Sequence, residues 1–256
     1  MPVVAVLGTD RGLRSTLRAG LPADVRVRSC RSTERLERVL AQTLVDAVIL
    51  RARGDDWLEP VADLRQRFPR IPVFGYGPFR ADDGARLAAA TQAGVHALLV
   101  EGVDEPVLGD LVSAGAASRT RARELADAPR LLRLNETLQQ RVWELALARA
   151  GSRLTTSDLA RAVGASREHL SREFAAGGAP NLKRVIDLTR VSCAADLLGN
   201  PGYTVRTCAA ILAFASPGHL SGASRRIAGV PPGELGRLGP RGVLGRFLRG
   251  RTRSRI

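Results

Sequence analysis

Short runs of β-branched apolar residues alternate with helix-like stretches over the first 115 residues. The runs are VVAVLG at 3–8, VRVRSC at 25–30, VDAVIL at 45–50, IPVFGY at 71–76 and HALLV at 96–100. Between them, leucines, valines and one phenylalanine recur at helical spacing, where they would cover the faces of a sheet. Strands that alternate with helices indicate a parallel sheet. We therefore expect a five-stranded, doubly wound α/β domain over residues 1–115.

The second half of the chain keeps a helical spacing of apolar residues and shows no strand pattern. A helix over residues 131–150 is ended by Gly151. Residues 116–130 are small or charged and poor in large apolar side chains, which indicates a linker that is either an exposed connection or a solvated helix. We expect an all-α domain over residues 131–238 after this linker.

Residues 154–174, LTTSDLARAVGASREHLSREF, have the pattern of two short helices joined by a tight turn. Gly164 supplies the turn, and Ser166 is placed to cap the second helix. Leu170 and Phe174, four residues apart, turn into the core. The opposite face of this helix carries Arg167, Glu168, Ser171 and Arg172. On a helix that lies in a major groove, such a face meets base edges and phosphates.

The same order of helix, turn and helix returns about 50 residues later. Ala209 follows Ala160 by 49 residues, and Leu220 follows Leu170 by 50 residues. Between the copies, residues 181–198 form a long amphipathic pattern that ends at the breaker GNPGY. The sequence therefore predicts two helix-turn-helix units joined by a rigid helix.

Positive charge is concentrated in this second half. The chain has 39 basic and 25 acidic residues, a net charge of +14. Residues 1–120 hold 16 arginines against 15 acidic residues, a net of +1, whereas residues 121–256 hold 23 basic against 10 acidic residues, a net of +13. An excess of this size indicates a polyanionic partner, and with a duplicated helix-turn-helix we expect double-stranded DNA.

Several phrases within residues 154–238 belong to a known pattern. They are LA at 159–160, GAS at 164–166, HLSREF at 169–174, Arg190 with Ala194 and LL at 197–198, AF at 213–214, SPGHL at 216–220 and GVPP at 229–232. Through them this region resembles the DNA-binding domain of the AraC family of bacterial transcription regulators. The resemblance implies two units in successive major-groove segments on one side of the duplex. It also places Arg172 at a position that the family uses for DNA contact.

The second unit departs from the pattern of that family. The family favours Gly-Phe in the turn, where this chain has Ala213 and Phe214, and Phe, Arg and Phe in the last helix, where it has Leu220, Gly222 and Ser224. Glycines in a helix lower its stability by about 1 kcal/mol each relative to alanine, and Ser224 removes an aromatic core contact. We therefore expect the first unit to dominate base recognition.

The outer face of the second unit offers Ser216, His219 and Ser221, with no arginine for bidentate guanine recognition. We expect this unit to contribute phosphate contacts through Arg225 and Arg226. In the first unit, Glu168 either reads a cytosine or pairs with Arg172 four residues on. His169 and His219 are expected as partly buried hydrogen-bonding side chains.

The N-terminal half resembles the receiver domain of bacterial response regulators in its order of strands and helices and in the phrases IPVFGYG and GVHALLVEGVDEPVL. A working receiver needs an acidic pair, a phosphate-accepting aspartate, a Thr or Ser and a Lys after its first, third, fourth and fifth strands. Those positions read Gly8 and Thr9, Arg51, Gly77 and Glu101. Without carboxylates a hard cation has no ligands, and a guanidinium cannot attack phosphorus, so we expect no phosphorylation at Arg51.

Asp10 lies one position beyond Gly8 and Thr9, and Asp55 and Asp56 lie four and five positions beyond Arg51. These aspartates leave open a shifted phosphorylation site. The alternative interpretation is that they are solvated loop carboxylates. The uses left for such a domain are dimerisation, docking of another protein, or binding of a ligand at the carboxyl ends of the strands. A homodimer through this domain and a contact with RNA polymerase are the further partners that we expect.

Other classes of function lack their signals. Three scattered cysteines form neither a disulfide framework nor a zinc pattern, which fits a reducing cytoplasm. The sequence has no signal peptide and no apolar run of about 18 residues, so we expect no membrane span. It has no metal cluster, nucleophile elbow or phosphate loop, and we expect neither an enzyme nor a cofactor.

The C-terminal tail, residues 239–256, is basic, and seven arginines and no acid lie within residues 237–256. We expect a frayed, solvated terminus. Two alternatives stay open: the tail lies along phosphates, or it forms a membrane-surface helix. The second rests on the helical spacing of Val243, Leu244, Phe247 and Leu248, and Gly245 argues against it.

Together these observations predict a sequence-specific DNA-binding transcription regulator with a non-phosphorylatable, receiver-like domain for dimerisation or sensing. The alternative is a protein-interaction adaptor with only non-specific DNA binding, because the second unit is weak at the family's Phe and Arg positions.

Overall fold

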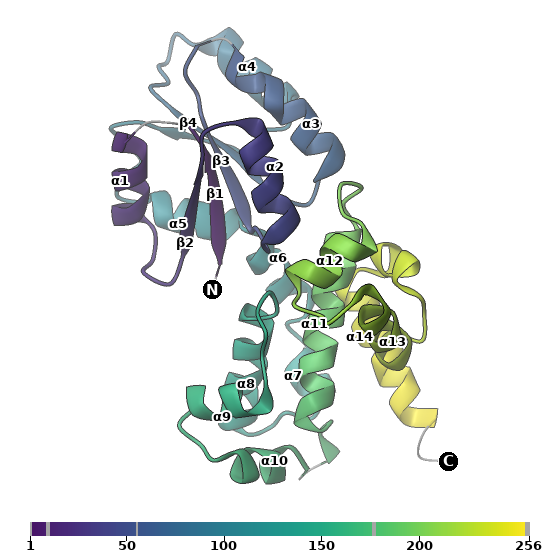
Figure 1. The fold of residues 1–256 in the computed structure, drawn as a ribbon. Coiled ribbons are helices and arrows are strands. Elements are labelled where there is room, and N and C mark those ends of the chain that lie inside the picture. The colour runs from purple at the N-terminus through teal and green to yellow at the C-terminus, as the bar shows by residue number, and fades with distance from the viewer. Residues whose placement is uncertain (1, 9–10, 55, 176–177, 254–256) are drawn as a thin grey trace. The chain divides into compact units, whose positions relative to one another are not determined.

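A computed structural model describes residues 2–8, 11–54, 56–175 and 178–253 (Figure 1). The chain divides into two compact units, Met1–Thr120 and Arg121–Ile256. Each unit has its own hydrophobic core.

The first unit is built on one parallel sheet whose strands lie in the order β2-β1-β3-β4-β5. This is the flavodoxin-like order of doubly wound folds. The strands are β1 Val3–Leu7, β2 Arg26–Cys30, β3 Ala47–Arg51, β4 Val73–Gly77 and β5 Ala97–Val100. The prediction of a five-stranded, doubly wound, receiver-like domain is therefore confirmed.

Helices cover both faces of this sheet (Figure 1). They are α1 Arg11–Gly20, α2 Thr33–Gln42, α3 Glu59–Arg67, α4 Gly84–Gln92 and α5 Leu108–Gly115, with a short 3-10 turn, Asp56–Leu58, before α3. Val4 and Ile49 pack with Leu17 of α1 and Leu108 of α5 in one core. Since successive strand residues point to opposite faces, the neighbouring strand positions pack under α2 and α3 instead.

All regular secondary structure among the described residues of the second unit is helical. Its elements are α6 Ala117–Glu124, which crosses the division between the units, α7 Ala128–Leu131, α8 Thr137–Ala148, α9 Thr156–Ala162, α10 Arg167–Ala175, α11 Leu182–Leu198, α12 Val205–Ile211, α13 Pro217–Ala228 and α14 Pro232–Arg253. Twelve residues of α11 are buried, and α8, α12, α13 and α14 all pack against this helix. The predicted all-α region is confirmed, with α11 as its central element.

The expected solvated linker over residues 116–130 is wrong for its second half. Leu125, in the turn after α6, and Ala128, at the start of α7, are both buried. Arg121 of α6 is buried as well, and its guanidinium lies 2.6 Å from the Asp196 carboxylate of α11. An arginine tolerates such burial when a carboxylate neutralises its charge. From Arg121 onward the segment is therefore attached to the core of the second unit by these three side chains, although most of its other residues are exposed.

The expected frayed terminus is also wrong over the described residues. Helix α14 bends at Gly239, whose φ is 62°, and continues from Pro240 to Arg253. Val243, Leu244 and Phe247 are buried, and the guanidinium of Arg184 on α11 lies 4.9 Å from the Phe247 ring centroid. Because the apolar side of this helix is covered by its own unit, the membrane-surface alternative is wrong too. Residues 254–256 lie outside the described part.

The buried pair between Arg121 and Asp196 makes a test of this packing. Replacing Arg121 by Met leaves the Asp196 carboxylate buried without its guanidinium, which should lower the free energy of unfolding of the second unit by about 3–5 kcal/mol. Denaturant titration of the purified chain measures it. Arg123→Met, at an exposed position of the same helix, should change the free energy by less than about 0.5 kcal/mol. A loss no larger than this control would contradict the assigned pair.

Candidate nucleic-acid interface

The first helix-turn-helix unit consists of α9, a tight turn and α10. Thr155 and Asp158 form a capping box at the start of α9. Gly164 takes a φ of +70° in the turn, and the Ser166 hydroxyl accepts a hydrogen bond of 3.0 Å from the backbone N–H of His169. The predicted turn glycine and the predicted cap are therefore both confirmed.

The face of α10 that the sequence assigns to DNA is exposed. Its anchors, Leu170 and Phe174, are completely buried on the other side. The exposed residues are Arg167, Glu168, Ser171 and Arg172. No ion pair joins Glu168 to Arg172 among the described residues, so the alternative of an intrahelical pair is not observed. His169 is exposed rather than partly buried, because it points to the solvent side of the same helix.

The second helix-turn-helix unit repeats this geometry with α12, a turn and α13. Ala213 takes a φ of +53° at the position that corresponds to Gly164. The Ser216 hydroxyl caps α13 by accepting from the N–H of His219 at 3.1 Å, and the Ser221 hydroxyl donates to the carbonyl of Pro217 at 3.0 Å. His219 is exposed rather than partly buried, and its ring lies edge-on to Phe214 at 5.9 Å. Two of the three polar groups expected on this face are thus engaged within their own helix.

Helix α13 is continuous through both of its glycines and ends at Gly229. Ser224 does not leave a hole where an aromatic side chain was expected: its buried hydroxyl donates to the carbonyl of Val230 at 2.7 Å. A buried hydroxyl is tolerated when it is hydrogen-bonded in this way. At the end of the helix, Arg225 and Arg226 are exposed, and Arg226 lies 3.5 Å from the Asp187 carboxylate of α11.

In the α/β unit, Met1–Thr120, the carboxyl ends of the strands carry an ion pair where a receiver has its phosphorylation site. Nη2 of Arg51 donates to both carboxylate oxygens of Glu101 at 2.7 Å, and the side chain of Arg51 is 6% exposed. The Tyr76 hydroxyl donates to Glu105 at 2.6 Å, and burial together with this bond raises the pKa of Tyr76 to about 12. A Cβ atom at Gly77 would lie 2.6 Å from the carbonyl oxygen of Ala52, so no side chain fits there.

The candidates for a shifted phosphorylation site are only partly described. Asp56 is exposed at the start of the 3-10 turn, whereas Thr9, Asp10 and Asp55 lie outside the described residues. Within the described ranges, no group of three His, Cys, Asp or Glu side chains could hold a metal ion. No described helix is long and apolar enough to cross a membrane.

Comparison with known families identifies a domain within the helical unit, Arg121–Ile256. A family model described as a helix-turn-helix domain matches residues 159–237, which span α9 to α14. Residues 159–237 form an AraC-type helix-turn-helix domain. The match covers less than a third of the chain, and no curated protein matches the sequence.

Solved structures of response regulators align with the chain at low identity. A response regulator from Thermotoga maritima is 18% identical, with 45% of this chain and 97% of that chain covered at a TM-score of 0.41. Full-length FixJ from B. japonicum is 14% identical, with 88% and 96% covered at a TM-score of 0.39. At scores below 0.5, the receiver-like fold of the first unit rests on its strand order.

Two side chains position the helices of the AraC-type domain, and their contacts were missed in the sequence. Buried Gln139 of α8 donates from Nε2 to the carbonyl of Glu173 at 2.7 Å, in the last turn of α10. Arg190 of α11 donates to the carbonyl of Leu212 at 3.1 and 2.6 Å and stacks 4.0 Å over the Phe214 ring. The pattern of Glu136 and Gln139 is a capping-box signal, but it does not reveal the long-range bond.

The two turns of the AraC-type domain make a matched test of backbone strain. A left-handed conformation costs an L-residue about 1–2 kcal/mol, which is partly offset by the smaller unfolded-state entropy of alanine. We expect Gly164→Ala to lower the free energy of unfolding and Ala213→Gly to raise it, each by about 1 kcal/mol. Thermal or denaturant unfolding measures both.

The control is Ala210→Gly, the same substitution at an exposed position inside α12, which should destabilise by about 1 kcal/mol. If Ala213→Gly destabilised the domain as Ala210→Gly does, the turn would not be strained.

Proposed function

We propose that the chain is a cytoplasmic transcription regulator that reads a specific DNA sequence mainly through α10 of its AraC-type domain. One observation carries this proposal: Arg167, Glu168, Ser171 and Arg172 share the exposed side of a helix that is anchored from behind by two buried side chains. The match of residues 159–237 to a helix-turn-helix family and the net charge of +13 over residues 121–256 support it.

The chemistry of this face suits the major groove. An arginine can donate two hydrogen bonds to O6 and N7 of guanine, and a glutamate can accept from N4 of cytosine. Arg167 and Arg172 form no ion pair with the described residues, so both guanidinium groups are available to a ligand. Gln139 fixes the last turn of α10 and thereby limits the ways in which this face can turn. A fixed face favours one register on the bases over many.

The second helix-turn-helix unit contributes mainly contacts with the phosphate backbone of DNA in this proposal. The hydroxyl groups of Ser216 and Ser221 already serve α13, and its exposed cations are Arg225 and Arg226 at the last turn. Arginines at such positions meet phosphates, which orient a protein on the duplex without reading its sequence. Arg226 would first exchange its contact with Asp187 for one with a phosphate.

The α/β unit, Met1–Thr120, acts without phosphorylation in this proposal. The guanidinium of Arg51 occupies the place of the phosphate-accepting aspartate, and Glu101 neutralises it. The domain therefore serves dimerisation or sensing, and a contact with RNA polymerase would link DNA binding to transcription.

Substitution of single arginines separates base recognition from phosphate contact. Arg172→Ala should weaken binding to the operator by about 1–3 kcal/mol and leave binding to random duplex nearly unchanged. Arg225→Ala should weaken both about equally and reduce the salt slope by about one. Fluorescence anisotropy over a range of salt concentrations measures these effects, with an operator recovered by selection from genomic fragments.

The matched control is Arg123→Ala, which removes an exposed arginine from α6, outside the residues of both helix-turn-helix units. Unchanged operator affinity of Arg172→Ala would show that α10 is not the reading helix.

Incubation with acetyl phosphate and magnesium tests the first unit. The chain should gain no phosphoryl group by intact-mass spectrometry, while a working receiver domain in the same mixture becomes phosphorylated. A phosphoryl adduct on any aspartate, including the candidates near Arg51, would refute this part of the proposal.

A protein-interaction adaptor is the second candidate function. It is favoured by the engagement of Ser216, Ser221 and Arg226 within the domain, which leaves the second unit few free polar groups. Selection from a genomic fragment library separates the two candidates, because an adaptor would recover no common sequence.

A further inference from the structure

The outer edge of the sheet in the first unit carries an open, arginine-lined groove. Among the described strands, β2 lies at the edge of the sheet and pairs with β1 alone. The groove, of about 600 Å³, is lined along this strand and the end of α1 by Arg18, Leu21, Val25, Arg26, Val27 and Arg28, with Pro22 and Ala23. It is a different surface from the carboxyl ends of the strands where Arg51 lies, and the proposed DNA contacts do not use it.

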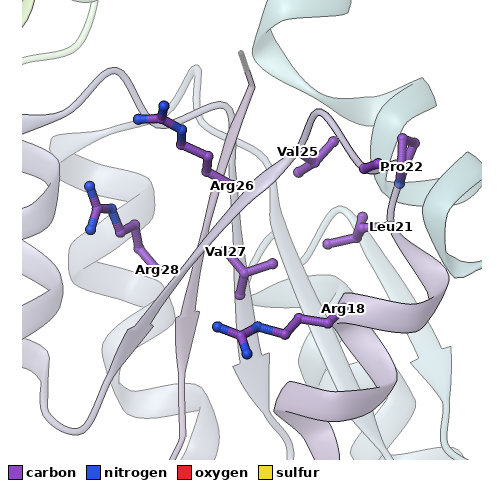
Figure 2. A pocket seen from close by; sticks show the side chains of 8 residues that line it. Arg18, Leu21, Pro22, Val25, Arg26, Val27 and Arg28 are labelled. Atoms are coloured by element: carbon purple, nitrogen blue, oxygen red, sulfur yellow. The ribbon is translucent and has the colours of Figure 1, made fainter.

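The two faces of β2 differ in chemistry. Figure 2 shows Arg26 and Arg28 on one side of the strand, and Val25 and Val27 on the other side, toward α1. Both arginines are exposed, whereas both valines are partly buried against the core. Arg18 reaches from α1 toward β2 beside Val27 (Figure 2). The groove therefore has a cationic face at Arg26 and Arg28 and, across the edge of the strand, a valine face with Arg18 beside it.

The backbone between these faces is oriented for pairing with a further strand. Arg26 donates its N–H to the carbonyl of Pro2, and Cys30 accepts at its carbonyl from the N–H of Gly8. In a parallel ladder, alternate residues direct their groups to the same neighbour. The N–H and carbonyl groups of Val27 and Ser29 therefore face away from β1, at the outer edge of the sheet.

We propose that β2 binds an extended, acidic segment of a partner protein, which adds to the sheet as a sixth strand with acidic and apolar residues in alternation. Side chains of an added strand point alternately to the two faces of the sheet, so its acidic residues would meet Arg26 and Arg28 while its apolar residues cover Val25 and Val27. Main-chain hydrogen bonds to Val27 and Ser29 supply affinity, and the two faces supply specificity.

Other occupants fit the groove less well than this segment. Two copies of β2 paired with each other would set arginines against arginines, which is destabilising. A small anion cannot reach both faces of the strand at once. Duplex DNA would contact the arginines, but it has no apolar side chains to cover Val25 and Val27, so it fits this groove less well than an alternating peptide. The arginines also discourage uncontrolled edge pairing, as charges on edge strands do.

The test uses the full chain and short fluorescein-labelled peptides. A peptide of alternating glutamate and valine should bind by anisotropy, whereas a block peptide of the same composition and an alternating lysine and valine peptide should bind at least about tenfold more weakly. Since only one edge of the peptide pairs with β2, N-methylation of alternate residues should abolish binding in one of the two possible patterns and spare it in the other.

Charge reversal on the protein gives the matched comparison. Arg26→Glu with Arg28→Glu should weaken the alternating peptide by at least about tenfold, whereas Arg80→Glu with Arg119→Glu, at exposed positions outside the groove, should leave its affinity within about twofold. All four positions are exposed, and unfolding curves check that both variants keep the fold.

Three results would overturn the proposal. Absence of binding by the alternating peptide would leave the arginines as guards of the edge. Equal binding of the block peptide would show an anion site without strand addition. An equal loss of duplex DNA affinity in the Arg26 and Arg28 variant would assign the groove to phosphates. The DNA affinity of the α10 variants is measured separately, so failure here does not touch the proposed reading helix.

Discussion

Burial of most of α11 is the constraint on which the helical unit, residues 121–256, depends. Twelve of its seventeen residues are buried and only Lys183 is exposed, so the helix cannot move without disturbing its neighbours. From this helix, Arg190 holds the end of α12, Asp196 holds α6 through Arg121, and Arg184 covers Phe247 of α14. The two helix-turn-helix units therefore share one rigid support, and the spacing between their exposed faces is fixed by the length of α11.

Local patterns in the sequence predicted the elements well. The strands were predicted because each is a β-branched run between polar segments, and their ends differ by at most two residues from the prediction. The first turn was found because Gly164 and Ser166 act on residues within a few positions. The duplication made the second helix-turn-helix recognisable even where Ala213 replaces a glycine. Signals of this kind need no knowledge of the fold.

Contacts between distant residues were the part that sequence could not supply. Arg121 and Asp196 are 75 positions apart, and Gln139 and Glu173 are 34 apart, so neither partner is visible in the other's surroundings. The tail shows the same limit. Its apolar spacing was noticed, but the count of arginines favoured a solvated end, because only the fold reveals that α11 covers Phe247. At the carboxyl ends of the strands, Arg51 and Glu101 were identified one by one, and the structure joins them.

The order of the C-terminal helix has a practical consequence for anyone who prepares the protein. Truncation after residue 238, where the family pattern ends, would remove Val243, Leu244 and Phe247 and expose apolar side chains of α11. Such a fragment would tend to aggregate in solution, and its poor behaviour would be mistaken for a defect in DNA recognition. Purification tags are better placed at the other terminus, and shortened versions should keep the chain through Arg253.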